Sequence, residues 1–502
     1  MPLSVPEPYD LAVIGAGSAG LAGAVTAGEL GLSVVLLDTS TDTGGQFYRT
    51  PAPALGAVRP EALHHDWSAY ADLRRRLARS EVRHLAGHHV WSVTKDEEAA
   101  DVWSVHAVTG ADGGGERPVR VRARAILLAT GAYERQLPFP GWTLPGVVGA
   151  GGAQAMLKSG LVLPGRRVVV AGSGPLLLAV ASSLAAAGAR VPAVVEASGY
   201  LHYARHPRAL VANPHKAAEA LIHGAALLWH RVRVRQRSAV TEVHGTDRVE
   251  AVTVSRLDRD WRPVRGTGRR IECDALAVGH GLVPQIELAT ALGCATRPLS
   301  DGTRALALDS LQETSVRDLW AAGETGGVGG AQLARMEGEL AAVAAAARLL
   351  GRPAHGGRVR ELQRRRDRMR AFAEAMTAAH APGPGWARWL ADDTEVCRCE
   401  EVSVGRIREA VDDLGARDAR TVKLLTRAGM GWCQGRMCGP AVACLAARDQ
   451  PTEPPAERRP FAVPVPLSAL AALDDPVVPV VDEPGDRSET TSEPGAAPGA
   501  DG

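Results

Sequence analysis

The chain alternates apolar runs of strand length with glycine-rich turns and helical stretches of small residues, and it does so twice. The apolar residues 11–14 end at a glycine, and a helical pattern and a second strand, 33–37, follow. From about residue 167 the same order of strand, glycine-rich turn, helix and strand returns. Strands that alternate with helices are typical of a parallel sheet covered by helices. We therefore predict an α/β fold that contains two units of this kind.

The first glycine-rich turn has the spacing G-x-G-x-x-G, formed by Gly15, Gly17 and Gly20. In such a turn the first glycine allows a tight bend, the second lets a pyrophosphate approach the backbone, and the third lets helix and strand pack closely. The backbone N–H groups of the helix that opens at Ser18 then face the phosphate. Asp38 ends the next strand, 23 residues after Gly15, where an acid suits hydrogen bonding to a ribose. These residues predict a Rossmann-like dinucleotide-binding domain.

Further residues of the first unit are predicted to lie near the same ligand. Gly45 belongs to a flexible turn after Asp38, and the amide of Gln46 is able to donate to a ring or a phosphate. A sharp turn at Gly131 follows a buried strand, and ligands of such folds lie beyond the carboxyl ends of the strands. A strand at 319–322 and the long helix after it resume the first unit. The second unit is therefore predicted to be inserted into the first.

The second unit keeps only part of the glycine pattern. Gly172 and Gly174 take the first two positions, but Leu177 replaces the third glycine. Glu196 ends the next strand in the place that Asp38 takes in the first unit. A second nucleotide, NAD or ATP, is therefore a candidate ligand here, and a fold kept only as a scaffold is the alternative.

Four of the seven cysteines fall in two tight pairs near the C-terminus. Cys397 and Cys399 form a Cys-x-Cys pair, and Cys433 and Cys438 form a Cys-x4-Cys pair. Thiolates are soft ligands that select zinc, copper(I) or iron–sulfur clusters. Four of them without a histidine fit a [2Fe–2S] cluster. Zinc is the alternative, although zinc sites usually have Cys-x2–4-Cys in both halves.

Composition excludes several classes of function. With 57 basic and 56 acidic residues the charge is balanced, so nothing points to nucleic acid. No apolar run is long enough for a membrane span, and the first eight residues lack the features of a signal peptide. We therefore expect a cytoplasmic protein, in which clustered cysteines favour a metal over a disulfide. No candidate base or nucleophile has a partner at a readable spacing, so the catalytic residues stay unassigned.

Changes in composition divide the chain into five regions. They are a first nucleotide-binding domain (1–145 and 285–352), a second one (146–284), a basic helix and linker (353–388), a small helical cysteine domain (389–450) and a Pro-rich acidic tail (451–502). The arginines of the basic helix are interpreted as a solvated face. The tail is predicted to be largely disordered. Residues 459–470 are nevertheless apolar enough to lie in an extended groove on this protein or on a partner.

The segments "GAGSAG", "LLATGAYE", "LAVGHGLVP" and "LWAAGETGGVGGAQLA" together resemble the two-dinucleotide-fold flavoprotein disulfide reductases, over roughly residues 9–350. The resemblance implies FAD in the first fold. It places the pyrophosphate on Gly15, Gly17 and Gly20, the adenosine ribose on Asp38, and the flavin-side phosphate and ribityl on Gly323 and Glu324. Disulfide reductases carry a redox-active cysteine pair beside the flavin, and no Cys-x-x-Cys or Cys-x4-Cys occurs here before residue 397. Thiol chemistry is therefore disfavoured.

The cysteine domain resembles the [2Fe–2S] domain of bacterioferritin-associated ferredoxin type. With "GGQFYR" and "TRAGMGWCQGRMCGP", the chain resembles the FAD-containing subunit of opine oxidases, hydrogen cyanide synthase and hydroxyproline dehydrogenases. In that family an amino acid or secondary amine, of opine, hydroxyproline or glycine type, is oxidised on a separate amino-acid-oxidase-like flavin subunit. The resemblance implies that this chain relays the electrons, and a small ferredoxin-like subunit is a further candidate partner.

Two other functions remain open at this point. One is an NAD(P)H-dependent flavoprotein reductase that passes electrons to an iron–sulfur acceptor. The other is an iron–sulfur sensing or scaffold protein that binds FAD structurally.

Overall fold

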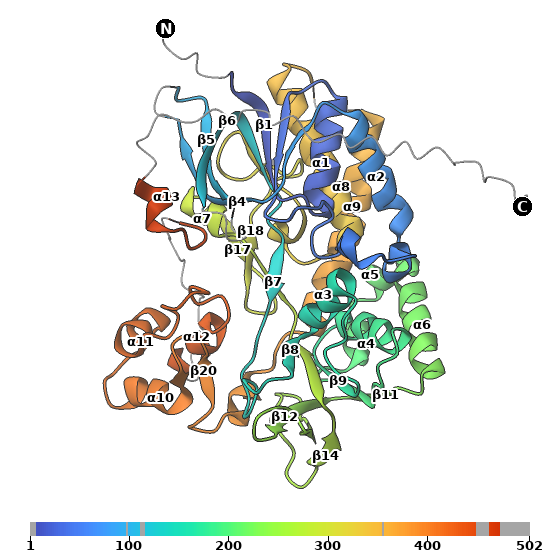
Figure 1. The fold of residues 1–502 in the computed structure, drawn as a ribbon, viewed down its shortest axis with the longest axis vertical. Helices are drawn as coiled ribbons and strands as arrows, with labels where there is room; N and C mark the ends of the chain where they lie inside the picture. Colours follow the sequence, from blue (N-terminus) through green and yellow to red (C-terminus); the bar gives the residue numbers. More distant parts are fainter. Residues whose placement is uncertain (1–6, 97–98, 111–115, 354–355, 448–460, 472–502) are drawn as a thin grey trace, which may run out of the picture.

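Two sheets, one in each predicted unit, form the centre of the structure (Figure 1). The computed structural model describes residues 7–96, 99–110, 116–353, 356–447 and 461–471. The first sheet runs in the order β3 (Arg83–Leu85), β2 (Val34–Leu37), β1 (Tyr9–Ile14), β6 (Arg117–Leu128), β5 (Trp103–Thr109) and β4 (His88–Lys95), and β19 (Leu319–Ala321) pairs with the carboxyl end of β6. This first sheet is mixed, since β5 pairs antiparallel with both β4 and β6, whereas the main sheet of the second unit is parallel. The central strands of the first sheet are buried on both faces, which explains their continuous apolar runs.

Helices from both ends of the first unit pack together with the basic helix beside this sheet (Figure 1). These helices are α1 (Ser18–Glu29), α2 (Trp67–Arg79), α8 (Ala331–Leu349) and α9 (Gly357–Ala379). α1 and α8 approach closely because Gly338 has no side chain, and an added Cβ there would lie 2.0 Å from the carbonyl oxygen of Ala19. β19 and α8 thus return to the first unit after the second, and the predicted insertion is confirmed.

The second unit has a parallel sheet and a small antiparallel one. The parallel sheet has the order β11 (Arg233–Gln236), β10 (Ala193–Glu196), β9 (Val168–Gly172), β15 (Ala275–Gly279) and β8 (Val147–Gly149), and the antiparallel sheet has the order β12 (Ser238–His244), β13 (Ala251–Arg256) and β14 (Arg269–Glu272). The helices of this unit are α3 (Ala150–Gly160), α4 (Leu176–Ala186), α5 (Pro207–Val211) and α6 (Pro214–Trp229). The predicted α/β class is therefore confirmed for both units.

Several short elements complete this part of the chain. They are the pairs β7 (Ala132–Glu134) with β16 (Leu282–Pro284) and β17 (Thr296–Pro298) with β18 (Arg304–Leu306), the helix α7 (Glu287–Ala291), and the 3-10 turns η1 (Pro53–Leu55), η2 (Pro60–Leu63), η3 (Tyr200–Arg205), η4 (Gly323–Gly326) and η5 (Pro384–Trp389). None of the helices in the described part of the chain is long and apolar enough to cross a membrane.

The cysteine domain is small and mostly helical. Its elements are β20 (Glu395–Cys397), β21 (Val402–Ser403), α10 (Val404–Asp412), α11 (Ala419–Thr426) and α12 (Gly439–Ala447). Side-chain caps start two of the helices, since Ser403 accepts from a backbone N–H of α10 and Asp418 from one of α11. The core of this domain is continuous with that of the second unit, and the indole N–H of Trp142 donates to the carbonyl of Glu395 at 2.7 Å.

A strap formed by residues 461–471, which ends in α13 (Leu467–Ala471), lies along the β4–β5 edge of the first sheet (Figure 1). The backbone N–H of Ala462 donates to the carbonyl of Trp91 at 2.9 Å, the ring of Phe461 packs edge-on against Trp91, and Ala469 is buried. These residues thus contact this protein itself, and the extended groove stays a prediction. The predicted disorder of the acidic tail concerns residues that lie outside the described ranges, apart from this strap.

Candidate functional site

The first glycine-rich turn forms a cradle between two backbones. Gly15 has φ +102°, and a Cβ added there would lie 2.4 Å from the carbonyl oxygen of Ala129. A Cβ at Gly20 would lie 1.8 Å from the carbonyl oxygen of Gly15, so both glycines are required by the fold. A Cβ at Gly17 would meet only the Cα of Gly45, at 3.9 Å. Gly45 packs directly against Gly17, because a Cβ added at Gly45 would lie 2.8 Å from the Cα of Gly17. The space that a side chain of residue 17 would fill stays open, as the approach of a pyrophosphate requires.

Asp38 lies next to this cradle. Its carboxylate oxygens accept hydrogen bonds from the backbone N–H groups of Ala16, at 2.5 Å, and Ser40, at 2.7 Å. The side chain remains partly exposed, so its free lone pairs are open to a ribose hydroxyl. The structure thus brings Asp38 and the glycine-rich turn together. The roles of these residues in binding, and that of Ser18 at the start of α1, stay predictions.

The other predicted residues of the first unit lie at the same edge of the sheet. Gly131 follows β6 with φ +78° and has open space where a Cβ would point. The Thr130 hydroxyl before it donates to the carbonyl of Gln285 at 2.7 Å. Gln46 is exposed, and its side-chain oxygen accepts from Arg49 at 2.8 Å. Its contact with a cofactor therefore stays a prediction.

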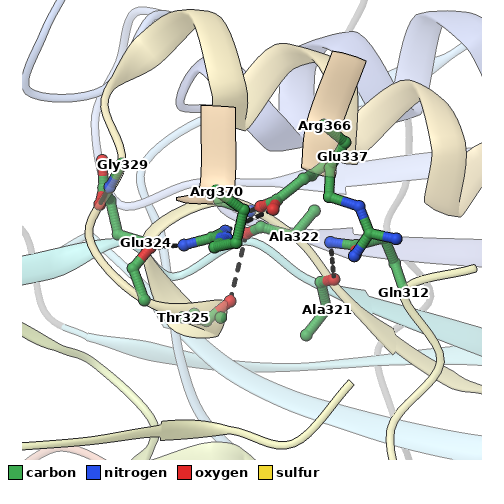
Figure 2. A network of polar contacts seen from close by, with 12 residues as sticks. Gln312, Ala321, Ala322, Glu324, Thr325, Gly329, Glu337, Arg366 and Arg370 are labelled. Atoms are coloured by element: carbon green, nitrogen blue, oxygen red, sulfur yellow. Dashed lines mark hydrogen bonds and ion pairs between the residues drawn. The ribbon is translucent and has the colours of Figure 1, made fainter. Parts of the chain in front are cut away.

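The carboxylate of Glu324 is already engaged by hydrogen bonds within the protein. Its carboxylate accepts from the backbone N–H groups of Gly329, at 2.8 Å, and Gly330, at 3.0 Å, and so closes the turn before α8 (Figure 2). Burial raises the pKa of this carboxyl despite those two donors. The backbone N–H of Gly323 is also engaged, because it donates to the carboxylate of Glu337 at 3.0 Å. The predicted contact of Gly323 and Glu324 with the flavin side stays a prediction.

Arg370 and Glu337 support this turn and were not expected from the sequence. Glu337 on α8 is 1% exposed, and its carboxylate is paired with the guanidinium of Arg370 on α9 (Figure 2). Arg370 also donates to the carbonyl of Gly327. The interpretation of the α9 arginines as a solvated face is therefore wrong for Arg370. An acid inside the otherwise Ala-rich helix was the available signal, since a buried charge requires a partner.

Lys158 is a second residue that sequence reasoning missed. Its side chain comes from α3 of the second unit, is 4% exposed, and donates to the carbonyl of Phe47 at 2.7 Å. Burial lowers the pKa of this lysine to about 8. Phe47 follows Gln46, so the two units meet at the loop that carries Gly45. A buried lysine with a lowered pKa beside a cofactor loop is a candidate functional group.

The acid of the second unit is covered by the chain itself. Glu196 is fully buried and accepts from the backbone N–H groups of Gly174, at 3.0 Å, and Ser198, at 2.9 Å, in the same way as Asp38. Unlike Asp38, it faces a side chain, because Nδ1 of His380 lies 3.4 Å from Oε1 of Glu196. Nucleotide binding at Gly172, Gly174 and Glu196 stays a prediction.

The cysteine side chains converge although 33 residues separate the two pairs in sequence. Cys397 contacts Cys438, and Cys399 contacts Cys433. Burial, together with the charge of Cys397, raises the pKa of Cys438. Within the described residues no three His, Cys, Asp or Glu side chains surround one point as a single ion requires. The charges of Cys433 and Cys397 also act on Cys438 and Cys399 respectively, so all four thiols lie in one place. This set of four soft donors fits a [2Fe–2S] cluster.

Comparisons with known proteins agree with this organisation. Residues 9–338 match the model of the family "Pyridine nucleotide-disulphide oxidoreductase", and residues 395–448 match "BFD-like [2Fe-2S] binding domain". Hydrogen cyanide synthase subunit HcnB of Pseudomonas aeruginosa is 35% identical over 442 residues, which cover 85% of this chain and 90% of the relative. An opine oxidase subunit of Agrobacterium tumefaciens is 35% identical over 482 residues, which cover 93% and 92%.

A solved structure shares the fold. L-proline dehydrogenase from P. horikoshii matches with a TM-score of 0.63 at 20% identity, over 92% of this chain and 79% of that chain. The two family models imply FAD in the first unit and a [2Fe–2S] cluster in the cysteine domain, which the cradle and the paired cysteines fit. The chain is thus an FAD-dependent oxidoreductase with an iron–sulfur domain. It belongs to the pyridine nucleotide-disulphide oxidoreductase family, together with hydrogen cyanide synthase subunit HcnB and the opine oxidase subunit.

Proposed function

We propose that this chain is the electron-relaying subunit of an enzyme complex that oxidises an amino acid or a secondary amine of opine, hydroxyproline or glycine type. The partner is an amino-acid-oxidase-like flavin subunit, and a small ferredoxin-like subunit is a further component. The observation that carries the proposal is the presence of two redox cofactor sites on one chain, the Gly17–Gly45 cradle and the two cysteine pairs. The relatives named above, which are themselves subunits, support it.

The residues of this chain would hold and separate the two cofactors. When bound, FAD accepts electron pairs and the cluster moves single electrons, so the two together convert one kind of transfer into the other. Gly17 and Gly45 offer backbone to the pyrophosphate, and Asp38 offers its free lone pairs to the ribose. Cys438 directly precedes α12, whose N-terminal N–H groups favour negative charge on sulfur.

The purified chain alone should therefore bind FAD but show little or no dehydrogenase activity towards proline-like, opine or glycine-type substrates. Turnover with a dye as acceptor should appear when the chain is co-expressed with an amino-acid-oxidase-like subunit. Flavin and iron content, measured on the same samples, control for cofactor loss. Strong amine oxidation by the isolated chain would overturn the relay proposal and direct the search for a base towards Lys158.

A second candidate function is an NAD(P)H-dependent reductase, which the Rossmann-like second unit favours. It requires a nicotinamide nucleotide beside Glu196, and in this structure His380 lies there. The other ring nitrogen of His380, Nε2, is 3.2 Å from the hydroxyl of Tyr203, so the histidine is held on both sides. We therefore expect that NADH, added without oxygen, leaves the flavin absorbance of the holoprotein unchanged. Photoreduction of the same sample is the positive control. Rapid bleaching by NADH would favour the reductase over the relay function.

A further inference from the structure

Arg436 lies within the four-residue spacer between Cys433 and Cys438, and its guanidinium points away from the cysteine domain. Its Nε donates to the carboxylate of Glu287 at 2.8 Å, and a second nitrogen donates to the carbonyl of Ala462. A third contact runs back to its own loop, to the carbonyl of Cys433 at 3.4 Å. One side chain therefore joins the cluster loop to two segments outside its domain.

Glu287 is tied to the cofactor edge of the first unit. It opens α7, whose Leu288 and Ala289 pack in the same core as Ile14 and Leu128, the last residues of β1 and β6. Two residues before it, Gln285 is hydrogen-bonded to the turn after β6, because its backbone N–H donates to the carbonyl of Gly131 at 2.9 Å. The Arg436–Glu287 pair thus links the cysteine loop to the turn that carries Gly131.

Ala462 belongs to the strap, which is itself fixed to the first sheet at Trp91. Figure 1 shows α7 and α13 on the side of this sheet that faces the cysteine domain. Two apolar residues of the strap that we considered for docking a partner, Ala462 and Ala469, are thus buried against this chain, whereas Leu467 stays exposed. The carbonyl of Ala462 instead accepts from Arg436, so the strap and α7 hold the same guanidinium from two directions.

The pair is sheltered from water. The side chain of Arg436 is 15% exposed and that of Glu287 is 11% exposed. The second carboxylate oxygen of Glu287 is buried and has no hydrogen-bond partner among the described residues. Removing Arg436 would therefore leave a buried carboxylate without its cation, which is far more costly than the loss of a surface pair.

We propose that Arg436 is a positioning residue that locks the cluster-ligating loop against α7 and the strap, and so fixes the cluster relative to the flavin edge of the first unit. This inference rests on the proposed electron relay, because the fixed placement serves transfer between the two cofactors. The cysteine domain keeps its apolar core with the second unit in any case. Loss of the lock should therefore free the loop and the strap without detaching the domain.

The test compares Arg436→Gln with Arg427→Gln in the full-length holoprotein. Arg427 also carries one charge near the cysteines, but it pairs with Glu400 inside the same domain at 2.9 Å and is 70% exposed. Hydrogen–deuterium exchange in α7 and residues 461–471 should rise by about 30-fold or more in Arg436→Gln, where about 30-fold is the lower end of the effect of truncating a buried charge pair. It should stay at the wild-type level in Arg427→Gln. Iron content should remain normal in both variants, and Arg436→Lys should be intermediate.

The second measurement follows reduction of the cluster, by its electron paramagnetic resonance signal, after the flavin is photoreduced without oxygen. In Arg436→Gln this step should slow by about tenfold or more, because small displacements of reacting groups cost large factors in rate. Exchange that does not change in Arg436→Gln, or that rises equally in Arg427→Gln, would overturn the lock. If the reduced flavin never reduces the cluster of the wild-type protein, the proposed electron relay is overturned. The hydrogen–deuterium exchange data would still test whether Arg436 locks the loop.

Discussion

Gly17→Val should give a folded protein that lacks flavin absorbance but keeps its cluster. Gly17 has φ −67°, a value open to any residue, and an added Cβ has only the Cα of Gly45 nearby, at 3.9 Å. The backbone therefore tolerates a side chain at this position, and the methyl groups of valine fill the space that the pyrophosphate needs. Overpacking of a close contact costs about 1–3 kcal/mol, and each 1.4 kcal/mol is about tenfold in affinity. We expect FAD affinity to fall by about tenfold or more, as measured by titration of the deflavinated protein.

Gly224→Val is a suitable control for this substitution. Gly224 lies in α6 of the second unit, and a Cβ added there has nothing within 4 Å, so the same chemical change occurs far from the cradle. This variant should bind FAD like the wild type. Gly17→Ala should fall between the wild type and Gly17→Val. A full complement of flavin in Gly17→Val would show that the cradle is not where the pyrophosphate binds.

In the two cofactor sites, the sequence predicts those residues that lie close together along the chain. The glycine-rich turn is contained in six residues, and Asp38 ends the very next strand, so a strand–turn–helix pattern is enough to place them together. Each cysteine pair is equally local. We could predict that the two cysteine pairs meet, because one metal centre needs all four thiolates. The sequence did not show how they meet, since the chain between Cys399 and Cys433 forms two helices.

The residues that sequence reasoning missed act across long distances in the chain. Arg370 meets Glu337 because α9 folds back on α8, and His380 reaches Glu196 across 184 residues of chain. Lys158 belongs to one unit and contacts a loop of the other. No periodicity encodes such contacts, since an arginine on a helix looks the same from sequence whether it faces water or a buried acid. The tertiary packing decides between the two.

Cys433→Ser should abolish the cluster and leave the flavin in place. A serine hydroxyl is a hard, poorly ionised ligand, whereas iron–sulfur clusters require soft thiolates. Anaerobically purified wild-type protein should contain about two irons and two sulfides per chain, and the variant should contain neither. Cys433 is a better choice for this test than Cys397 or Cys438, because it is partly exposed whereas those two are buried in the core of the domain. The FAD cradle has a separate core and should be unaffected.

Cys444→Ser provides the matched control. Cys444 lies in α12, only six residues after Cys438, and its thiol contacts Trp386 rather than the paired cysteines. The same exchange of sulfur for oxygen there should leave iron, sulfide and the electron paramagnetic resonance signal of the reduced cluster at wild-type levels. Loss of the cluster in Cys433→Ser alone would identify a ligand rather than a general sensitivity of the domain. Wild-type protein with stoichiometric zinc and no acid-labile sulfide would contradict the cluster itself, because zinc needs the same four thiolates but no sulfide.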